Sequence, residues 1–399
     1  MMKMRMTTIN PDYYCSQKFW WLSVDIEKLT TQSCCSASPH KINIDWIENY
    51  PGKLFNTPKL QSERKFMLDN IPVETCQSNC WTPERHGLQS RRLIMQSNVK
   101  THTNIESDPT HLNIIIGSNC NMTCVYCCKQ YSSAWFKDIA DNGTYPINET
   151  NNDRYKINNK DRVVASVSQK EINVSPNKTK LINELGHLCS DSNISNIDIT
   201  GGEPFLYLYL EDLISKLPKT VQISVYTGLG VDEKRFSIEL KKLQKYQNIN
   251  IVVSCENIGK PYEMVRAGNS WQRFENNLLE IQKHKIKYSF NSTLTNLTLF
   301  GLVDFVKYVG NADMRFGLCN DPKFLSIHIM DDNSKDIIYN SINQLPLAAQ
   351  NIIKNSLDII PDTYERADLK NYLIEFAKRR ELTLDIFPKT FIEWLNNVV

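Results

Sequence analysis

Three regularly spaced cysteines are the residues of this chain best suited to chemistry. Cys120, Cys124 and Cys127 form a C-x3-C-x2-C pattern directly after an apolar run, 111–117, that ends in glycine. Thiolates this close together can hold three of the four irons of a cubane iron–sulfur cluster. A fourth protein ligand would give an electron-transfer cluster, whereas an open iron can bind a small molecule. The adjacent Cys128 must point elsewhere, and we interpret it as a packing residue.

A second motif, Thr200-Gly201-Gly202-Glu203-Pro204-Phe205, follows the next predicted strand, 196–200. Glycines permit close approach of a backbone, and a glutamate offers an anionic acceptor to an ammonium group. In this order, the two motifs resemble those of the radical S-adenosylmethionine (radical SAM) superfamily. The resemblance implies that SAM binds the open iron of a [4Fe–4S] cluster held by Cys120, Cys124 and Cys127. It also implies that the methionine amino group of SAM is held by Gly201, Gly202 and Glu203.

The resemblance suggests three further cofactor-binding residues. An aromatic residue commonly precedes the third cysteine in the superfamily, and Tyr126 stands there. Ser254 lies at the end of the predicted strand 248–255, where the family places polar contacts to SAM. Arg266 lies in YEMVRAGNSWQRFENNL, which looks like a segment of peptide-modifying members. Ser254 and Arg266 could equally be hydrogen-bonded groups at a strand end or a helix cap.

Five other cysteines form an N-terminal group at positions 15, 34, 35, 76 and 80. Their spacing resembles the twitch domain, a short relative of the SPASM domain, which binds one auxiliary [4Fe–4S] cluster through four cysteines. PERHGLQSRR (83–92) resembles the E-x-x-G-x-x-S-x-R stretch beside such sites. In most relatives this domain follows the radical SAM core, whereas here it precedes it. The resemblance implies the ligands Cys15, Cys34, Cys76 and Cys80, although spacing does not decide between Cys34 and Cys35. A zinc site using the same thiolates is the alternative.

Alternating strands and helices must position these motifs. Apolar runs predict six strands at 111–117, 196–200, 221–227, 248–255, 286–294 and 314–319. Helix-like stretches lie between them at 209–217, 232–246, 270–284 and 299–309. This alternation predicts an α/β fold with a parallel sheet, whose active site lies at the carboxyl ends of the strands. The resemblance makes it a partial (β/α)6 TIM-like barrel.

Three segments are expected along the chain. A small Cys-rich auxiliary-cluster domain covers 10–95 and includes a strand at 19–26, which with the stretch to Cys34 could close a hairpin. The radical SAM core covers 108–330 and is interrupted by a long loop at 137–180, within which DNGTYPINETNNDRYKINNKDR (141–162) is Asn-rich and nearly free of apolar residues. A helical C-terminal extension covers 331–399.

Composition restricts the class of protein. The 399 residues are 41% hydrophobic, which excludes wholesale disorder, and the formal net charge of +2 gives no polyanion-binding signature. No run of 18 apolar residues predicts a membrane span, and the N-terminus lacks the features of a secretion signal. We therefore expect a cytoplasmic, reducing location, in which the 12 cysteines indicate metal binding or catalysis rather than disulfides.

The family resemblance implies a reaction. A reduced cluster cleaves SAM to methionine and a 5′-deoxyadenosyl radical, which abstracts hydrogen from an unactivated C–H bond. The auxiliary cluster would accept an electron from the substrate radical or pass one through, which suits oxidation or crosslinking of a peptide side chain or a small metabolite. Flavodoxin or ferredoxin would supply electrons. The alternatives are modification of a nucleobase or nucleotide, disfavoured by the near-neutral charge, and a non-catalytic iron–sulfur or zinc protein.

Overall fold

The computed structural model describes residues 13–35, 37–85, 90, 92–93, 104–148, 153–156, 175–357, 359 and 363–398. The chain divides into two compact units. Unit 1 comprises Met1–Gly117, Asn173–Thr200 and Tyr209–Ser224, and unit 2 comprises Ser118–Ile172, Gly201–Leu208 and Val225–Val399. The three segments expected from the sequence, 10–95, 108–330 and 331–399, stay a prediction.

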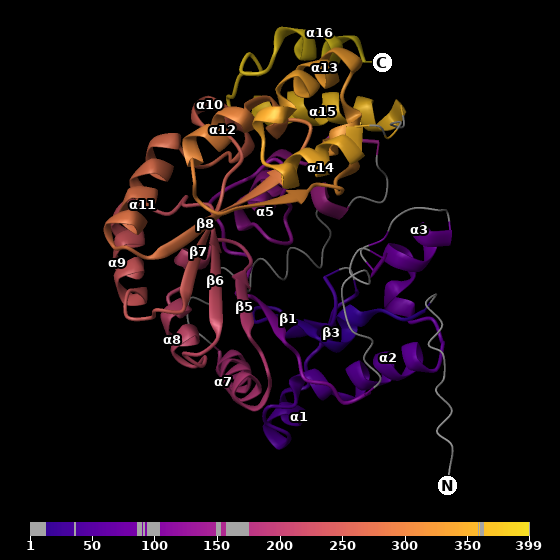
Figure 1. The fold of residues 1–399 in the computed structure, drawn as a ribbon, viewed down its shortest axis with the longest axis vertical. Helices are drawn as coiled ribbons and strands as arrows, with labels where there is room; N and C mark the ends of the chain where they lie inside the picture. The colour runs from indigo at the N-terminus through magenta and orange to yellow at the C-terminus, as the bar shows by residue number, and fades with distance from the viewer. Residues whose placement is uncertain are drawn as a thin grey trace. The chain divides into compact units, whose positions relative to one another are not determined.

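One sheet contains all nine strands of the described residues (Figure 1). In spatial order they are β3 (His40–Lys41), β2 (Thr30–Gln32), β1 (Trp21–Asp25), β4 (His111–Ile115), β5 (Asn196–Thr200), β6 (Gln222–Thr227), β7 (Ile249–Ser254), β8 (Lys287–Leu294) and β9 (Met314–Leu318). The pairs β4–β5, β7–β8 and β8–β9 are parallel. The six predicted core strands are thus confirmed, and among the described residues the sheet ends at β3 on one side and at β9 on the other, which is consistent with a partial barrel.

In unit 1, β1 begins a hairpin and also extends the parallel sheet. It pairs with β2 in antiparallel register, which confirms the predicted strand and hairpin. It also pairs with β4 in parallel register, Trp21 opposite His111 and Asp25 opposite Ile115. The pairing with β4 was not expected, because no local sequence signal specifies a partner about 90 residues away.

Helices in unit 1 include some that the sequence did not indicate. α1 (Ile44–Asn49), α2 (Pro58–Leu68) and α3 (Thr82–Arg85) lie in the Cys-rich N-terminal segment, where no helical period was evident. α7 (Pro176–Asp191) is joined to that segment by Glu184, whose carboxylate accepts the backbone N–H groups of Gly52 and Leu54 at 2.7 and 2.9 Å. α8 (Leu210–Ser215) confirms the helix predicted at 209–217.

The helices of unit 2 largely follow the predicted pattern. α9 (Glu233–Leu243), α11 (Trp271–Lys283) and α12 (Leu302–Val309) confirm three predicted helices, and α10 (Gly259–Val265) is an addition. Asp232 and Ser270 cap α9 and α11 through their side chains, as their residue types favour. The predicted helical tail contains α13 (Asp332–Ser341), α14 (Leu347–Leu357), α15 (Thr363–Arg379) and α16 (Lys389–Asn397).

The predicted loop at 137–180 is helical at both ends. Residues 137–142 continue α5 (Ser133–Asn142), which Ser132 caps, and residues 176–180 begin α7, which Ser175 caps. A capping serine followed by a helix is a local signal that the Asn-rich composition of the segment obscured. Residues 149–152 and 157–174 of the predicted loop lie outside the described residues.

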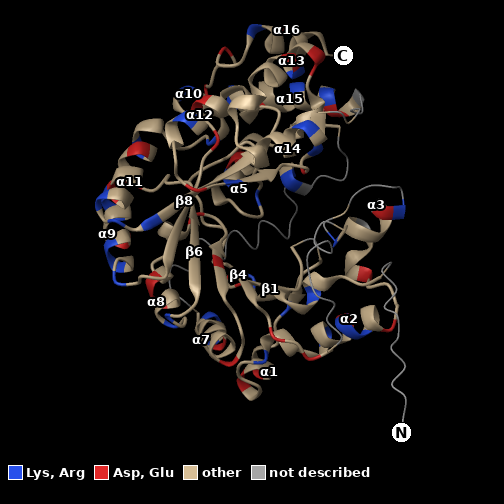
Figure 2. Ribbon diagram, viewed as in Figure 1, with Lys and Arg blue, Asp and Glu red and all other residues tan. Residues whose placement is uncertain are grey.

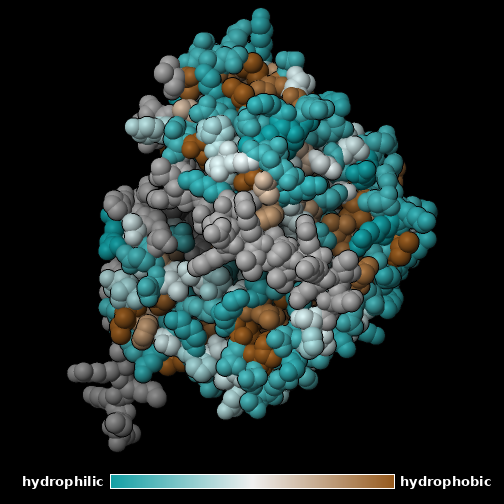
Figure 3. Space-filling model, turned by 180° about the vertical axis from the view of Figure 1, so that it is seen from behind, coloured by the Kyte–Doolittle hydropathy of each residue, from teal (hydrophilic) through white to brown (hydrophobic). Residues whose placement is uncertain are grey.

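Charges of both signs are mixed on the outer helices. Figure 2 shows Lys and Arg among Asp and Glu on α9 and α11, which agrees with the small net charge. On the face drawn in Figure 3, hydrophobic residues form separate patches between hydrophilic ones. Within the described ranges, no helix combines the length and hydropathy that crossing a membrane requires.

Candidate functional site

In unit 2, the motif cysteines lie together in one buried group. Cys120 and Cys124 are 8% and 7% exposed, Cys127 is half-buried, and all three pack with Met122 and Tyr126. Burial and, less strongly, the neighbouring Cys124 and Glu203 together raise the pKa of Cys120 to about 12. Clustered thiols resist ionisation in this way unless a cation offsets their charge, so the donor set fits an iron–sulfur cluster.

Two neighbouring segments hold the cysteine loop by its backbone. The N–H groups of Thr123 and Val125 donate to the carbonyls of Ala267 and Val265 at 2.7 and 2.9 Å. On the other side, the Ser133 hydroxyl at the start of α5 accepts the N–H of Cys120 at 3.1 Å. These hydrogen bonds fix the backbone conformation of the cysteine loop.

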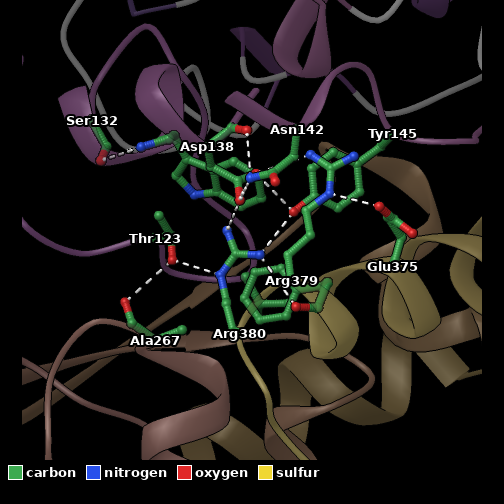
Figure 4. A network of polar contacts seen from close by, with 12 residues as sticks. Thr123, Ser132, Asp138, Asn142, Tyr145, Ala267, Glu375, Arg379 and Arg380 are labelled. Carbon is green, nitrogen blue, oxygen red and sulfur yellow. Dashed lines mark hydrogen bonds and ion pairs between the residues drawn. The ribbon is translucent and has the colours of Figure 1, made fainter. Parts of the chain in front are cut away.

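The region around the end of α15, in the C-terminal extension, also contacts this loop (Figure 4). Arg380, just after α15, donates to the Thr123 hydroxyl at 2.8 Å and to the Tyr145 hydroxyl at 2.8 Å. Its guanidinium lies over the rings of Trp135 and Phe376, at 4.9 and 3.8 Å from their centroids. The predicted C-terminal extension thus supports the cysteine loop.

Two buried aromatic residues complete this support. The Tyr372 hydroxyl, from α15, donates to the carbonyl of Val125 at 2.5 Å. The Trp135 indole, from α5, donates to the carbonyl of Cys124 at 3.0 Å. Both side chains are fully buried in one apolar core. The contact of Tyr372 with Val125 could not be predicted locally, since these residues are 247 positions apart in the sequence.

The GGE motif lies directly against the cysteine loop. Glu203 donates its N–H to the carbonyl of Asn119 at 2.8 Å. A Cβ on Gly202 would stand 2.3 Å from the same carbonyl oxygen, so only glycine fits there. The neighbouring Gly201 has φ +126°, a conformation that residues with side chains rarely adopt. The two motifs that the sequence singled out are therefore in contact.

Glu203 is completely buried, and its carboxylate has protein partners. It accepts the Thr227 hydroxyl at 2.8 and 2.9 Å, the N–H of Gly228 at 3.0 Å and the N–H of Phe205 at 3.3 Å. Burial raises its pKa to about 7, against the effect of these hydrogen bonds. The contacts join the GGE loop to the carboxyl end of β6, which is a positioning role. Contact with the SAM amino group stays a prediction.

Arg266 and Tyr126 are joined through a residue that the sequence analysis missed. Arg266 donates to both carboxylate oxygens of Glu256, at 2.5 and 2.9 Å, and the Tyr126 hydroxyl donates to Glu256 at 2.8 Å. The remaining terminal nitrogen of Arg266 lies 3.8 Å from the Cys124 sulfur. Burial lowers the pKa of Arg266, but Glu256 and, less strongly, Tyr126 and Cys124 raise it well above its usual range.

A local signal for Glu256 was present. It is a charged residue two positions after the end of β7, at the edge of the sheet where active sites form. Ser254, which ends β7, is half-buried and opposite Asn291 of β8, also half-buried. Ser254 therefore lies on the same edge, in a position that suits the predicted polar contact. That contact is not itself tested.

Cys128 lies outside the group formed by the three motif cysteines. Cys128 is buried, which by itself raises its pKa. Its hydrogen bond to Cys127 and, less strongly, the charge of Arg154 outweigh this effect and lower the pKa to about 7. Arg154 is itself paired with Asp321 at 2.6 and 3.0 Å. The interpretation of Cys128 as a residue that is not a ligand stays a prediction.

In unit 1, four N-terminal cysteines are buried near one another. Cys15, Cys76 and Cys80 pack in one cluster with Met67, Val73 and Trp81. Burial raises the pKa of Cys15 to about 12, and the charge of Cys34 contributes next. Cys34 is 6% exposed, whereas Cys35 is exposed. Burial and proximity favour Cys34, and the assignment of the four ligands stays a prediction.

The predicted E-x-x-G-x-x-S-x-R stretch lies beside Cys80. Arg92 and Ser90 both contact the carboxylate of Glu84, and Arg92 also donates to the carbonyl of Tyr14 at 3.0 Å. Burial raises the pKa of Cys80, while hydrogen bonds from Arg92 and Ser90 act in the opposite direction. Gly87 lies outside the described residues.

The cysteine groups differ from a preassembled site for one ion. In the part of the chain that the structure describes, no three Cys, His, Asp or Glu side chains are placed to hold a single metal ion. A cubane cluster binds each thiolate to a different iron, so its ligands need not converge on one point.

Solved structures similar to this chain are those of anSMEcpe and SuiB. A structure of polyhistidine-tagged anSMEcpe with bound AdoMet has 18% identity and a TM-score of 0.37, covering 58% of this chain and 59% of anSMEcpe. Streptococcus suis SuiB bound to S-adenosylmethionine has 13% identity and a TM-score of 0.39, covering 72% of this chain and 53% of SuiB. SuiB was also solved with the precursor peptide SuiA, at 14% identity and a TM-score of 0.37, covering 82% of this chain and 52% of SuiB.

Each of these matches spans less than two thirds of the solved protein's own length. No protein-family model and no curated protein matches the chain. Because the TM-scores are below 0.5, we infer function from the residues of the site alone.

Proposed function

We propose that this protein is a radical SAM enzyme. The observation that carries the proposal is the contact between its two motifs: Glu203 donates to Asn119, next to the first cysteine, and Gly202 leaves room for the same carbonyl. A structural zinc knuckle would not need a glycine-rich loop against its cysteines. A cofactor that contacts an iron through one part and an ammonium-binding loop through another would need both the cysteines and the glycine-rich loop.

The chain's residues divide the task. Cys120, Cys124 and Cys127 would hold a [4Fe–4S] cluster, and Gly201 and Gly202 would let the methionine part of SAM approach the backbone. When bound and reduced, this cluster supplies the electron that cleaves SAM to methionine and a 5′-deoxyadenosyl radical. Glu203 positions the GGE loop through Thr227 and Gly228.

Arg266 contributes charge. Its guanidinium lies beside the Cys124 sulfur while Glu256 holds it in place, so a buried cation faces the anionic cluster ligand. A donor of this kind is among the features that set the potential of an iron–sulfur cluster. Tyr126 donates to the same carboxylate, which orients its ring beside the cysteine loop. Ser254 is proposed to contact SAM at the edge of the sheet.

We further propose that Cys15, Cys34, Cys76 and Cys80 bind an auxiliary [4Fe–4S] cluster. Four buried thiols and the Glu84–Ser90–Arg92 contacts beside Cys80 support this assignment. A zinc ion on the same thiolates is the competing assignment, and metal analysis separates the two. The auxiliary cluster suits net oxidation or crosslinking, because the substrate radical must give up an electron in both.

The proposed substrate is a peptide side chain or a small metabolite, and flavodoxin or ferredoxin is the proposed electron donor. To separate the substrate classes, the enzyme would be supplied with the peptide fraction or the small-molecule fraction of a cell extract. The fraction that accelerates release of 5′-deoxyadenosine contains the substrate class. Acceleration only by nucleotides or nucleic acid would contradict this part of the proposal.

Anaerobic reconstitution with iron and sulfide tests the cofactor assignment. The proposal expects about eight irons per chain, four for each cubane. It also expects the electron paramagnetic resonance signal of the reduced protein to change when SAM is added. About four irons per chain together with a SAM-sensitive signal would contradict the auxiliary-cluster assignment alone and leave the core cluster assignment standing. Bound zinc with no SAM-sensitive signal would overturn the proposed enzyme.

A further inference from the structure

A fully buried lysine lies among the N-terminal cysteines of unit 1. Lys18, three residues after Cys15, has no exposed surface. Its ammonium donates to the Glu63 carboxylate at 2.6 Å and to the Ser33 hydroxyl at 3.1 Å. Burying such a pair removes both ions from water, so a hydrophobic pair of similar volume would often serve stability as well.

The partners of Lys18 connect the segments that contain the cysteines. Glu63 of α2 accepts the hydroxyls of Ser33 at 3.4 Å and Thr75 at 3.3 Å, and His40 contacts it at 2.8 Å. Ser33 directly precedes Cys34, and Thr75 directly precedes Cys76. The backbone N–H of Lys18 donates to the carbonyl of Cys15 at 3.3 Å. One ion pair thus touches three of the four cysteine segments.

The lysine also places a fixed positive charge among the cysteine segments, with its ammonium 3.1 Å from the hydroxyl of Ser33, the residue before Cys34. A cluster ligated by four thiolates is an anion, and it gains one more negative charge when it is reduced. A fixed cation nearby therefore stabilises the reduced form more than the oxidised form, and net charge is one of the quantities that set such potentials.

We propose that Lys18, held by Glu63, is the charge-compensating residue that raises the reduction potential of the cluster at Cys15, Cys34, Cys76 and Cys80. This inference rests on the proposed auxiliary cluster. It makes Lys18 a positioning and tuning residue rather than a ligand, and it explains why a charged residue is retained in a buried site. The auxiliary cluster would then be an electron acceptor whose reduction potential is set by the residues around it.

The test measures potential rather than turnover. In the full chain, Cys120, Cys124 and Cys127 are changed to alanine, so that only the N-terminal cluster remains. A redox titration followed by electron paramagnetic resonance then compares this reference with the same protein carrying Lys18→Met. The expected result is about a tenfold fall in the ratio of reduced to oxidised cluster at a fixed potential, which is about 59 mV for one electron. Lys65 is an exposed lysine on α2, the helix that carries Glu63, and Lys65→Met should leave the ratio unchanged.

A second variant guards against a merely structural effect. Glu63→Gln removes the anion and leaves the lysine, so it should raise the ratio, in the opposite direction to Lys18→Met. Shifts of the same sign in both variants, or no shift in Lys18→Met with its cluster intact, would overturn the role of Lys18. If Lys18→Met fails to load iron, the sign of the Glu63→Gln shift decides. A reference protein with zinc or no cluster would overturn the auxiliary-cluster assignment itself, and this inference with it.

Discussion

Gly202 approaches the carbonyl oxygen of Asn119 so closely that a Cβ there would stand 2.3 Å from it. Asn119 directly precedes the first motif cysteine, and the same carbonyl accepts the N–H of Glu203. One backbone oxygen thus joins the GGE loop to the loop of Cys120, Cys124 and Cys127. The joint fixes the distance between the proposed cluster ligands and the proposed site of the SAM amino group.

Gly202→Ala should separate these two loops. The new methyl group meets backbone rather than a flexible side chain, so the loop must shift, at a cost of about 1–3 kcal/mol. We expect the dissociation constant of SAM to rise roughly tenfold or more, with the iron of the core cluster retained. Equilibrium binding of SAM to the reconstituted protein measures it. Gly317→Ala is the matched control, because a Cβ there meets nothing within 4 Å. If both substitutions weakened SAM binding equally, the contact between Gly202 and Asn119 would not be what positions the two loops.

Thr227→Val distinguishes two roles of Glu203. The substitution removes the hydroxyl that both carboxylate oxygens accept and leaves a buried acceptor underused, at a cost of about 1–3 kcal/mol. If Glu203 acts by positioning the loop, Thr227→Val and Glu203→Gln should weaken SAM binding to a similar degree. If Glu203 instead binds the ammonium group directly, Glu203→Gln should weaken binding far more. Isothermal titration of SAM into both variants distinguishes the two roles. We predict similar losses of SAM affinity in Thr227→Val and Glu203→Gln.

The order of strands and the two motif loops could be predicted from local patterns. Apolar runs such as 249–254 are visible in the sequence, and the cysteine and GGE motifs follow their strands directly. Arg266 could be singled out, and the position of Glu256 just after β7 was a local signal. Their pairing could not be predicted, because it depends on how the segment after β7 folds back. The register of β1 with β4 and the contact of Tyr372 with Val125 are equally long-range.

The adjacent cysteines at 34 and 35 offer a matched pair for the auxiliary cluster. Cys34 is buried near the other three thiols, whereas Cys35 is exposed. Cys34→Ser should therefore lower the iron content from about eight to about four per chain, and Cys35→Ser should leave it at about eight. Iron and sulfide analysis after anaerobic reconstitution measures both. The reverse pattern would reassign the ligand to Cys35.

The C-terminal support of the cysteine loop predicts an effect far from the motif in sequence. Arg380→Met removes hydrogen bonds to Thr123 and Tyr145 and two ring contacts, at a cost of about 2–4 kcal/mol. We expect a lower midpoint in chemical denaturation and incomplete loading of the core cluster. Lys378→Met, whose side chain is 76% exposed, should change stability by less than about 0.5 kcal/mol. Normal stability and cluster loading in Arg380→Met would show that Arg380 does not support the loop.

The measurement that tests the central claim most directly is reductive cleavage of SAM. Anaerobically reconstituted protein is reduced with dithionite, incubated with SAM, and the release of 5′-deoxyadenosine and methionine is quantified. The wild-type chain should produce both. Cys124→Ala, which removes the central thiolate of the buried group, should produce neither. Release of 5′-deoxyadenosine by Cys124→Ala at the wild-type rate, or none from the iron-loaded wild-type chain, would contradict the proposed function.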